Sequence, residues 1–400
     1  MLNEEINMNF LKKKIGIIGG GQLGKMMILD AKRLGFYVVT LDPTEKCPSH
    51  SISDEHIVAA FDDEAAMLEL AKKTDVITYE FEHISAKALG KIENSGYKVY
   101  PTVSSLRIIQ NKLTQKAHLN KNGILIPNYR EVSAIEDIYS CGEDFSYPIM
   151  LKTCTGGYDG KGNYLIKTAS EVETAFALLG AGRVPLMVEQ FVSFVMEISV
   201  LACRGIKGDI VVYPVGQNIH KDSILDETIV PAPISKECTQ NAMKLAHDVM
   251  EIFNGVGMFC VEMFVTENGE VLVNEVAPRP HNSGHYTIEG CLTSQFEQHI
   301  RAITDLPFGA VELRTPTVMR NLLGEDDSDG KTLVLGLDEA LRNPNTKVHI
   351  YGKQEVKAKR KMGHLTVCAD TLEEARQQAE ESKNLIRIIA DNNAGGSYEN

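Results

Sequence analysis

The sequence has few of the features that mark membrane-spanning, secreted or nucleic-acid-binding proteins. No window of about 18 residues is apolar and uncharged, so we expect no transmembrane segment. The first ten residues contain Glu4 and Glu5 and no long apolar stretch, which argues against a signal peptide. Lys and Arg number 41 against 54 Asp and Glu, a formal charge of −13. An acidic chain without a basic block is a poor general nucleic-acid binder, although a few cations can hold a small anionic substrate.

Paired cysteines are also missing. The eight cysteines are scattered and none belongs to a C-x-x-C pair, which fits reduced thiols in a cytoplasmic protein rather than a zinc site or a disulfide framework. Apolar residues make up 43% and charged residues 24% of the chain, as in an ordinary soluble globular protein. The 400 residues are enough for two or three domains.

Strands and helices alternate near the start of the chain. Residues 14–42 predict a β-α-β unit, and further strands (76–78 and 98–100) and helices (63–73 and 85–94) continue the alternation. This pattern is typical of a parallel, doubly wound α/β sheet, which we expect to end near residue 105. From 147 to 276 strands come in pairs joined by glycine-rich turns, an α+β pattern, and a smaller mixed region follows from about 315.

A glycine motif follows the first predicted strand. Gly19, Gly21 and Gly24 have the spacing of a dinucleotide fingerprint, and Asp42 closes the next strand at about the expected distance. Taken alone, the motif indicates NAD. Its physical content is weaker, because a tight turn with free helix-terminal amides suits any phosphate. The glycines could also merely shape a βα turn.

Two glutamates are predicted to face each other across a hairpin. Asn268-Gly269 is typical of a two-residue turn, here between strands 258–265 and 270–276. In that register Glu262 lies opposite Glu275, with Phe264 and Val273 on the same face. Two facing carboxylates repel unless a cation lies between them, and hard oxygen ligands suit Mg²⁺ bound with substrate phosphates. The alternative is a solvated sheet face that tolerates the repulsion.

Glycines also dominate 155–163. The segment is not a P-loop, but a glycine hairpin can fold over phosphates and offer backbone N–H groups, and Lys152 on the preceding strand would add a charge. The alternative is an ordinary mobile loop.

The strand that carries Glu275 runs into a dense polar loop. Arg279 lies between two prolines, and Asn282, Ser283 and two histidines (281 and 285) follow. Polar groups this dense beside a metal pair predict a substrate pocket. Either histidine alone could instead be a structural residue.

Together these stretches resemble the ATP-grasp superfamily and, within it, are similar to the 5-(carboxyamino)imidazole ribonucleotide synthase family. The resemblance extends from about Lys14 to Ile389. The stretches that carry it are 19–24, 79–83 (YEFEH), 155–162, 274–285 and 360–364 (RKMGH).

The resemblance implies a fold and a reaction. The fold is a Rossmann-like N-terminal domain (1–105), an ATP-grasp domain (106–312) with a lid subdomain at about 125–190, a small mixed C-terminal domain (313–392) and a tail (393–400). The reaction joins bicarbonate to 5-aminoimidazole ribonucleotide in purine biosynthesis. ATP forms carboxyphosphate, and ADP and phosphate are released. The expected partners are small molecules, with Mg²⁺ as cofactor, no nucleic acid, no membrane and a second subunit in a homodimer.

The resemblance also implies site residues. Metal ligands are Glu262 and Glu275, and the catalytic residues are Arg279, His281 and Lys152. The positions expected to contact ATP are Lys112, Lys152, Gly157, Tyr158, Asp159, Gly160, Lys161, Gly162, Asn163, Glu189, Gln190, Phe191, Val192, Glu197, His220, Asn274 and Glu275. Those expected to contact the ribonucleotide are Gln22, Leu23, Glu80, Tyr158, Asp159, Arg279, Asn282, Ser283, Lys353 and Arg360, the last two at its 5′-phosphate.

Two positions depart from the pattern. Many relatives have Glu-x-Asn on the metal strand, whereas this chain has Ala277, which leaves Asn274 as a possible third ligand. Lys112 stands where the family often has Arg, so a bidentate contact is replaced by a point charge.

Three alternatives remain at this point. Another ATP-grasp ligase of the purine pathway would use formate or an amino acid, and the loop 277–285 argues against it. An NAD-dependent oxidoreductase would leave Glu262 and Glu275 without a role. A catalytically silent binding protein is disfavoured because the expected reactive positions are filled.

Overall fold

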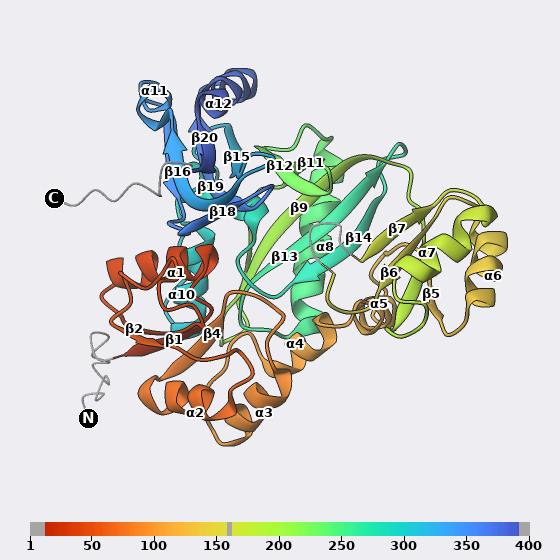
Figure 1. Ribbon diagram of the computed structural model, residues 1–400, viewed down its shortest axis with the longest axis horizontal. Coiled ribbons are helices and arrows are strands. Elements are labelled where there is room, and N and C mark those ends of the chain that lie inside the picture. Colours follow the sequence, from red (N-terminus) through yellow and green to blue (C-terminus); the bar gives the residue numbers. More distant parts are fainter. Residues whose placement is uncertain (1–12, 158–161, 392–400) are drawn as a thin grey trace, which may run out of the picture.

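The computed structural model describes residues 13–157 and 162–391. The chain forms an N-terminal α/β unit, a large central sheet, a small sheet with its own helices at one end, and a C-terminal region beside the other end (Figure 1). The described residues contain no helix with the length and apolar character needed to cross a bilayer. All eight cysteines, each of them within the described ranges, are free thiols, as the scattered pattern predicted.

The N-terminal unit is a parallel sheet of order β3-β2-β1-β4, as predicted. Its strands are β1 (Lys14–Ile18), β2 (Tyr37–Leu41), β3 (Glu55–Ile57) and β4 (Val76–Tyr79), and its helices are α1 (Gln22–Arg33), α2 (Glu64–Lys73), α3 (Ala86–Asn94) and α4 (Val103–Ile109). One face packs on α2, α3 and α4 and the other on α1 and the later helix α10 (Gln295–Thr304), so the sheet is doubly wound. The strand predicted at 98–100 is only a bridge between Val99 and Ile77.

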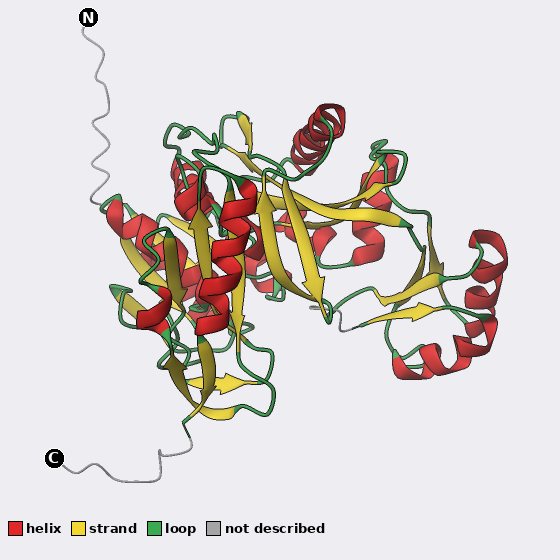
Figure 2. Cartoon of the chain, turned by 90° about the horizontal axis from the view of Figure 1, so that it is seen from above, coloured by secondary structure: helices red, strands yellow, loops and turns green. Residues whose placement is uncertain are grey.

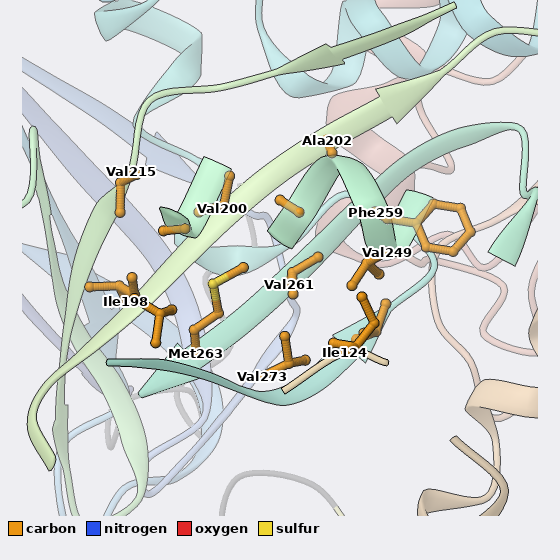
Figure 3. Close-up of a cluster of buried hydrophobic side chains, with 14 of the residues drawn as sticks. Ile124, Ile198, Val200, Ala202, Val215, Val249, Phe259, Val261, Met263 and Val273 are labelled. Atoms are coloured by element: carbon orange, nitrogen blue, oxygen red, sulfur yellow. The ribbon is translucent and has the colours of Figure 1, made fainter. Parts of the chain in front are cut away.

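The central sheet has the order β14-β13-β9-β11-β12-β15-β19-β17, with β10 paired to β9. Its strands are β9 (Phe194–Arg204), β10 (Ile210–Val212), β11 (Gly216–Lys221), β12 (Ile224–Val230), β13 (Gly257–Thr266), β14 (Val271–Ala277), β15 (Thr317–Leu323), β17 (Thr346–Ile350) and β19 (Lys361–Cys368). The amphipathic helix α8 (Lys236–Phe253) buries its apolar side against one face, where Val249, Phe259 and Val261 meet (Figure 3). The helix α5 (Lys112–Lys121) adds Leu119 to this core.

The two remaining sheets are smaller. The first, of order β5-β8-β6-β7, contains β5 (Tyr129–Val132), β6 (Ile149–Thr153), β7 (Asn163–Ile166) and β8 (Leu186–Gln190), and α6 (Ile135–Phe145) and α7 (Val172–Leu178) cover it; we call this body the small lobe (Figure 2). The second contains β16 (Asp329–Leu335), β18 (Glu355–Lys357) and β20 (Arg387–Ala390). Short helices α9 (Thr287–Gly290) and α11 (Leu337–Ala340) and the long α12 (Leu372–Leu385) complete the chain.

The β13–β14 hairpin differs from the predicted one. Its loop holds three residues, 267–269, because Thr266 pairs with Glu270 and Gly269 adopts φ +77°. A bulge then shifts the register between Glu262 and Met263, which restores Glu262 opposite Glu275. The predicted glutamate pair is therefore confirmed. The face predicted for Val273 was wrong, because Val273 pairs with Met263 in the core (Figure 3). Phe264 pairs with Leu272 instead.

A buried histidine fastens the N-terminal unit to the central sheet. His299 on α10 accepts a hydrogen bond at Nδ1 from the N–H of Met258 (3.0 Å), so its Nε2–H donates to the hydroxyl of Thr78 (2.8 Å). Burial lowers the pKa of His299 to about 3. The imidazole of His299 is therefore neutral in the folded protein at neutral pH.

The stability of the protein should consequently fall in mild acid. The unfolded chain takes up a proton at His299 below pH ~6.5, which the folded chain resists until about pH 3, so His299 alone should cost about 2 kcal/mol at pH 5 relative to pH 8. Urea unfolding at both pH values should show this loss. His299→Gln should show a smaller one, and the same pH dependence in both proteins would contradict the prediction.

Candidate functional site

A cavity of about 820 Å³ opens between the small lobe, the central sheet and the N-terminal unit. The small lobe contributes Lys152 and Glu189, the central sheet Glu262 and Glu275, and the N-terminal unit Glu80. Most of the residues expected at the site line this cavity: Gln22, Leu23, Glu80, Lys152, Gly157, Asn163, Glu189, Gln190, Phe191, Val192, Glu197, His220, Glu262, Asn274, Glu275, Arg279, His281 and Asn282. Residues far apart in the sequence thus share one site.

The glutamate pair lies at the centre of the cavity wall. Burial and the neighbouring charge of Glu275 raise the pKa of Glu262 to about 7. Burial also opposes ionisation of Glu275, but the ammonium of Lys112, 2.5 Å from its Oε1, outweighs that effect and lowers its pKa. Lys112 therefore stands behind Glu275 and does not itself line the cavity. Glu275 therefore keeps its negative charge, whereas Glu262 resists ionisation unless a cation lies beside it.

Asn274 adds a third oxygen beside the pair. The β13–β14 bulge opposes Met263 and Glu262 to Val273 and Glu275, which leaves Asn274 between them on the cavity wall. Its Oδ1 is buried and has no hydrogen-bond partner among the described residues. Two carboxylates and an orphaned amide oxygen are the hard donors that Mg²⁺ prefers, so the residues present fit that ion.

Two lysines meet at one buried carboxylate. Burial alone would raise the pKa of Glu189, but Lys116 (2.7 Å) and Lys152 contact its two oxygens and lower it to about 2. Glu189 thus fixes the ammonium of Lys152 at the cavity. Lys116 was missed by sequence reasoning, although its place one turn after Lys112 on α5 puts both ammonium groups on one helix face.

Another carboxylate holds Arg279. Glu82, just after β4, accepts from its Nε (2.5 Å) and Nη2 (3.0 Å), a bidentate pair. Burial alone would raise the pKa of Glu82, but the guanidinium of Arg279 outweighs burial and lowers this pKa to about 2. Glu82 stands in the 79–83 stretch of the resemblance but was not expected to act. The contact between Glu82 and Arg279 forms only in the folded chain, where the loop 277–285 lies beside the end of β4.

The glycine turn after β1 is already filled. The carboxylate of Glu80 accepts from the N–H groups of Gly21 and Gly24, both at 2.7 Å. A Cβ on Gly21 would lie 2.6 Å from Glu80 Oε1, which explains the glycine. Asp42 is occupied as well, since it accepts from Gly20 N–H at 2.8 Å. The carboxylate of Glu80 thus occupies the position that the pyrophosphate of NAD would need. This turn is therefore not an NAD site.

Aromatic and polar groups line the far end of the cavity. Phe194 and Phe264 stack with centroids 4.7 Å apart and planes 10° from parallel. Glu197 contacts Nδ1 of His220; burial lowers the pKa of this histidine, but Glu197 more than compensates and the net shift is upward. A flat apolar surface beside a hydroxyl acceptor suits a nucleoside.

Several expected residues lie elsewhere. Among the described ones, Lys112, Gly162, Ser283, Lys353 and Arg360 do not line the cavity. Ser283 is fully buried behind His281, and Arg360 is exposed with Nη1 donating to the carbonyl of Glu355 (2.7 Å). Four further residues expected at the site lie outside the described residues: Tyr158, Asp159, Gly160 and Lys161. Lys361, which was not expected, lines the cavity.

Three family profiles match consecutive parts of the chain. They are the ribonucleotide synthetase preATP-grasp domain (12–110), the ATP-grasp domain (117–296) and the phosphoribosylaminoimidazole carboxylase C-terminal domain (317–378). Together they account for most of the chain.

Known proteins resemble it over nearly its whole length. The N5-carboxyaminoimidazole ribonucleotide synthase of Bacillus subtilis is 45% identical over 88% of this chain and 90% of its own length. The solved N5-carboxyaminoimidazole ribonucleotide synthetase of Thermotoga maritima superposes with a TM-score of 0.87 at 45% identity, covering 95% of this chain and all of that one. The Aspergillus clavatus enzyme, solved with ADP and 5-aminoimidazole ribonucleotide, superposes with a TM-score of 0.87 at 36% identity over 94% and 99% of the two chains.

Proposed function

Because the chain belongs to the N5-carboxyaminoimidazole ribonucleotide synthase family of ATP-grasp enzymes, we propose that its 820 Å³ cavity is where the three substrates of that reaction meet. The enzyme is a ligase that carboxylates 5-aminoimidazole ribonucleotide in purine biosynthesis with ATP. The observation that carries the location is the convergence of Glu262, Glu275, Arg279 and Lys152 on one cavity.

The carboxyl group comes from bicarbonate. Transfer of the γ-phosphoryl of ATP to a bicarbonate oxygen gives carboxyphosphate and ADP. The exocyclic amine then either attacks the carboxyl carbon and displaces phosphate, or attacks CO₂ after carboxyphosphate has split into CO₂ and phosphate. In both routes the N–C bond forms and the amine gives up one proton. Formation and use of carboxyphosphate need stabilisation of negative charge and exclusion of water. A buried cavity with fixed cations supplies both.

Mg²⁺ is the implied cofactor, with Glu262, Glu275 and Asn274 as its candidate ligands. When bound, the ion neutralises phosphate charge during phosphoryl transfer. Lys152, held by Glu189, directs its ammonium to the same phosphates. Gly157 and Asn163 line the cavity as well and are proposed to contact ATP.

Adenine and ribose fit the far end of the cavity. Phe191 and Val192 follow β8 and, with Gln190, form the edge where adenine would meet backbone groups. Glu197, fixed by His220, is the acceptor for the ribose hydroxyls. The Phe194–Phe264 stack closes this end with apolar surface.

Arg279 and His281 are the groups proposed to hold bicarbonate and the developing oxyanion. The bidentate contact with the Glu82 carboxylate fixes the guanidinium of Arg279. The remaining N–H donors of Arg279 therefore keep one direction. A fixed cation costs no reorganisation when charge develops on the substrate.

The ribonucleotide is proposed to lie along Gln22, Leu23, Glu80 and Asn282, with its 5′-phosphate near the C-terminal strands. Lys353 lies close enough to Glu80 to lower the pKa of that carboxyl, although burial raises it overall. We propose Arg360 as the second residue that binds this phosphate. Lys361 is an additional candidate, because it lines the cavity.

Arg360→Ala tests this end of the site. A charge-assisted phosphate contact is worth about 1.5–3 kcal/mol, so KM for the ribonucleotide should rise roughly 10- to 100-fold while KM for ATP stays within about twofold. Lys359→Ala is the matched control, because Lys359 belongs to the same basic run but pairs with Asp222 (2.7 Å). Equal rises in both KM values would remove Arg360 from the phosphate site.

One assay tests the function as a whole. Phosphate release from MgATP should depend on both bicarbonate and aminoimidazole ribonucleotide. Stimulation by formate or an amino acid instead would favour another ATP-grasp ligase, and release without either substrate would contradict the carboxylation. No measurable release would favour a silent binding protein.

Domain boundaries, oligomeric state and cellular location are also part of the proposed function. We place the domain boundaries near 105 and 312, with the lid at about 125–190, and expect a cytoplasmic homodimer by resemblance to the family. Sedimentation of the purified protein near twice 44.2 kDa would support the dimer.

A further inference from the structure

A chain of buried hydroxyls ends at the imidazole of His281. The side chain of Ser283 lies 2.9 Å from His281 Nδ1 through its Oγ, and the backbone N–H of Ser283 also points at Nδ1, at 3.3 Å. Behind it, the hydroxyl of Ser199 on β9 donates to Ser283 Oγ at 2.9 Å. Ser199 and Ser283 are both buried.

The donors in this chain fix where the imidazole proton sits. A backbone N–H can only donate, so His281 Nδ1 must accept. Because Ser199 donates to Ser283, the hydrogen of Ser283 Oγ is available for Nδ1 as well. A neutral imidazole whose Nδ1 accepts carries its proton on Nε2. Burial, with the charges of Arg279 and Lys361 nearby, lowers the pKa of His281 well below its usual range, in keeping with a neutral ring.

The backbone of His281 is held from the other side. Gln295, fully buried at the start of α10, accepts from the His281 N–H and donates to its carbonyl, both at 2.8 Å. These contacts fix the main chain, and the serines fix the ring. Among the described residues, Nε2 of His281 has no hydrogen-bond partner, and the side chain lines the cavity.

We infer that His281 meets the substrate as a neutral Nε2–H hydrogen-bond donor, and that Ser199, acting through Ser283, is a positioning residue that fixes this tautomer. The inference rests on the proposed function, since the oxygen that receives the bond belongs to bicarbonate or carboxyphosphate. It also corrects the expected role of Ser283, which supports His281 from behind and does not line the ribonucleotide site. A nitrogen that already carries a proton cannot take one from the substrate amine, so His281 is not the base.

The tautomer can be measured without turnover. Two-bond ¹H–¹⁵N correlations of ¹⁵N-histidine protein, with His281 assigned by its absence in His281→Gln, should give the pattern of an Nε2-protonated ring. An Nδ1-protonated or a charged ring at pH 7.5 would overturn the inference. Ser199→Ala should shift the pattern toward a tautomer mixture, and an unchanged pattern would remove Ser199 from the role.

Kinetics test the donor separately. Gln can place an amide N–H near the position of Nε2 but cannot act as a base, so His281→Gln should retain about tenfold more kcat than His281→Asn, whose amide is too short. Equal losses in two folded variants would overturn the donor role. Ser199→Ala should lower kcat about fivefold with KM for ATP unchanged, and adding it to Ser283→Ala should change nothing further.

Ser382→Ala, which removes another buried hydroxyl far from the cavity, is the control for packing and should leave kcat unchanged. Additive losses for Ser199 and Ser283 would indicate packing and overturn the relay. If wild-type protein shows no phosphate release dependent on bicarbonate and aminoimidazole ribonucleotide, the proposed function fails, while the NMR result still decides the tautomer.

Discussion

Glu275→Gln should lower turnover by about 100- to 1000-fold while the protein stays folded. The variant removes one of two facing carboxylates and with it the negative charge that would hold a metal ion against the phosphates. Losing a single preorganised electrostatic contact commonly costs this much. Stability should change little, because two effects oppose each other. Lys112 loses its charged partner, while Glu262, whose pKa burial and the Glu275 charge together raise to about 7, is relieved of that like charge. Phosphate release and the thermal midpoint are the measurements.

The same hairpin supplies a control for Glu275→Gln. Glu270 is exposed at the turn, four residues before Asn274, and Glu270→Gln removes the same charge without touching the cavity. It should keep wild-type turnover. If Glu275→Gln retains wild-type phosphate release at limiting Mg²⁺, the facing glutamates are not a metal site.

Arg279→Lys should lower kcat by about 100-fold although the charge is kept. The guanidinium donates to both oxygens of Glu82, and an ammonium cannot reproduce that fork or keep a second set of donors directed at the substrate. Product formation should fall more than ATP consumption, because the oxyanion is then poorly held. The ratio of phosphate released to carboxylated product measures this.

Glu82→Gln should have a similar effect through the other partner. Arg279→Lys combined with Glu82→Gln should therefore be much less damaging than the sum of the two single changes. Arg301→Lys is the matched control: Arg301 also grips a carboxylate, that of Glu297 on its own helix, but lies away from the cavity. Strict additivity would mean that Glu82 does not act through Arg279.

Local sequence patterns predicted the elements that carry the site. The alternation in the first 100 residues specified a parallel sheet, and the Asn-Gly turn placed Glu262 opposite Glu275. That placement was right although the turn was not a two-residue one, because the bulge at Glu262 and Met263 compensates for the three-residue loop. Bulges depend on packing between sheet and core, which a turn motif does not encode.

Ionic partners from distant segments could not be predicted in the same way. Lys116 and Glu189 are 73 positions apart, and Arg279 and Glu82 are 197 apart. Each pair forms only once the small lobe or the loop 277–285 has docked. The glycine fingerprint shows the same limit, since its spacing is that of a cofactor site and only the fold reveals that Glu80 fills it.

The continuity of the central sheet has a consequence for how the protein could be divided. β12 pairs with β15 over four residue pairs, from Glu227–Arg320 to Val230–Thr317, so the C-terminal strands and the glutamate hairpin belong to one hydrogen-bonded ladder. Cutting the chain between α10 and β15 would expose the unpaired N–H and C=O groups of β12 together with Ile229, which packs on the C-terminal core. The fragment 1–312 should therefore aggregate when made alone. In evolutionary terms, the C-terminal region is not an exchangeable module, and any replacement would have to reproduce the β12–β15 register as well as the substrate contacts.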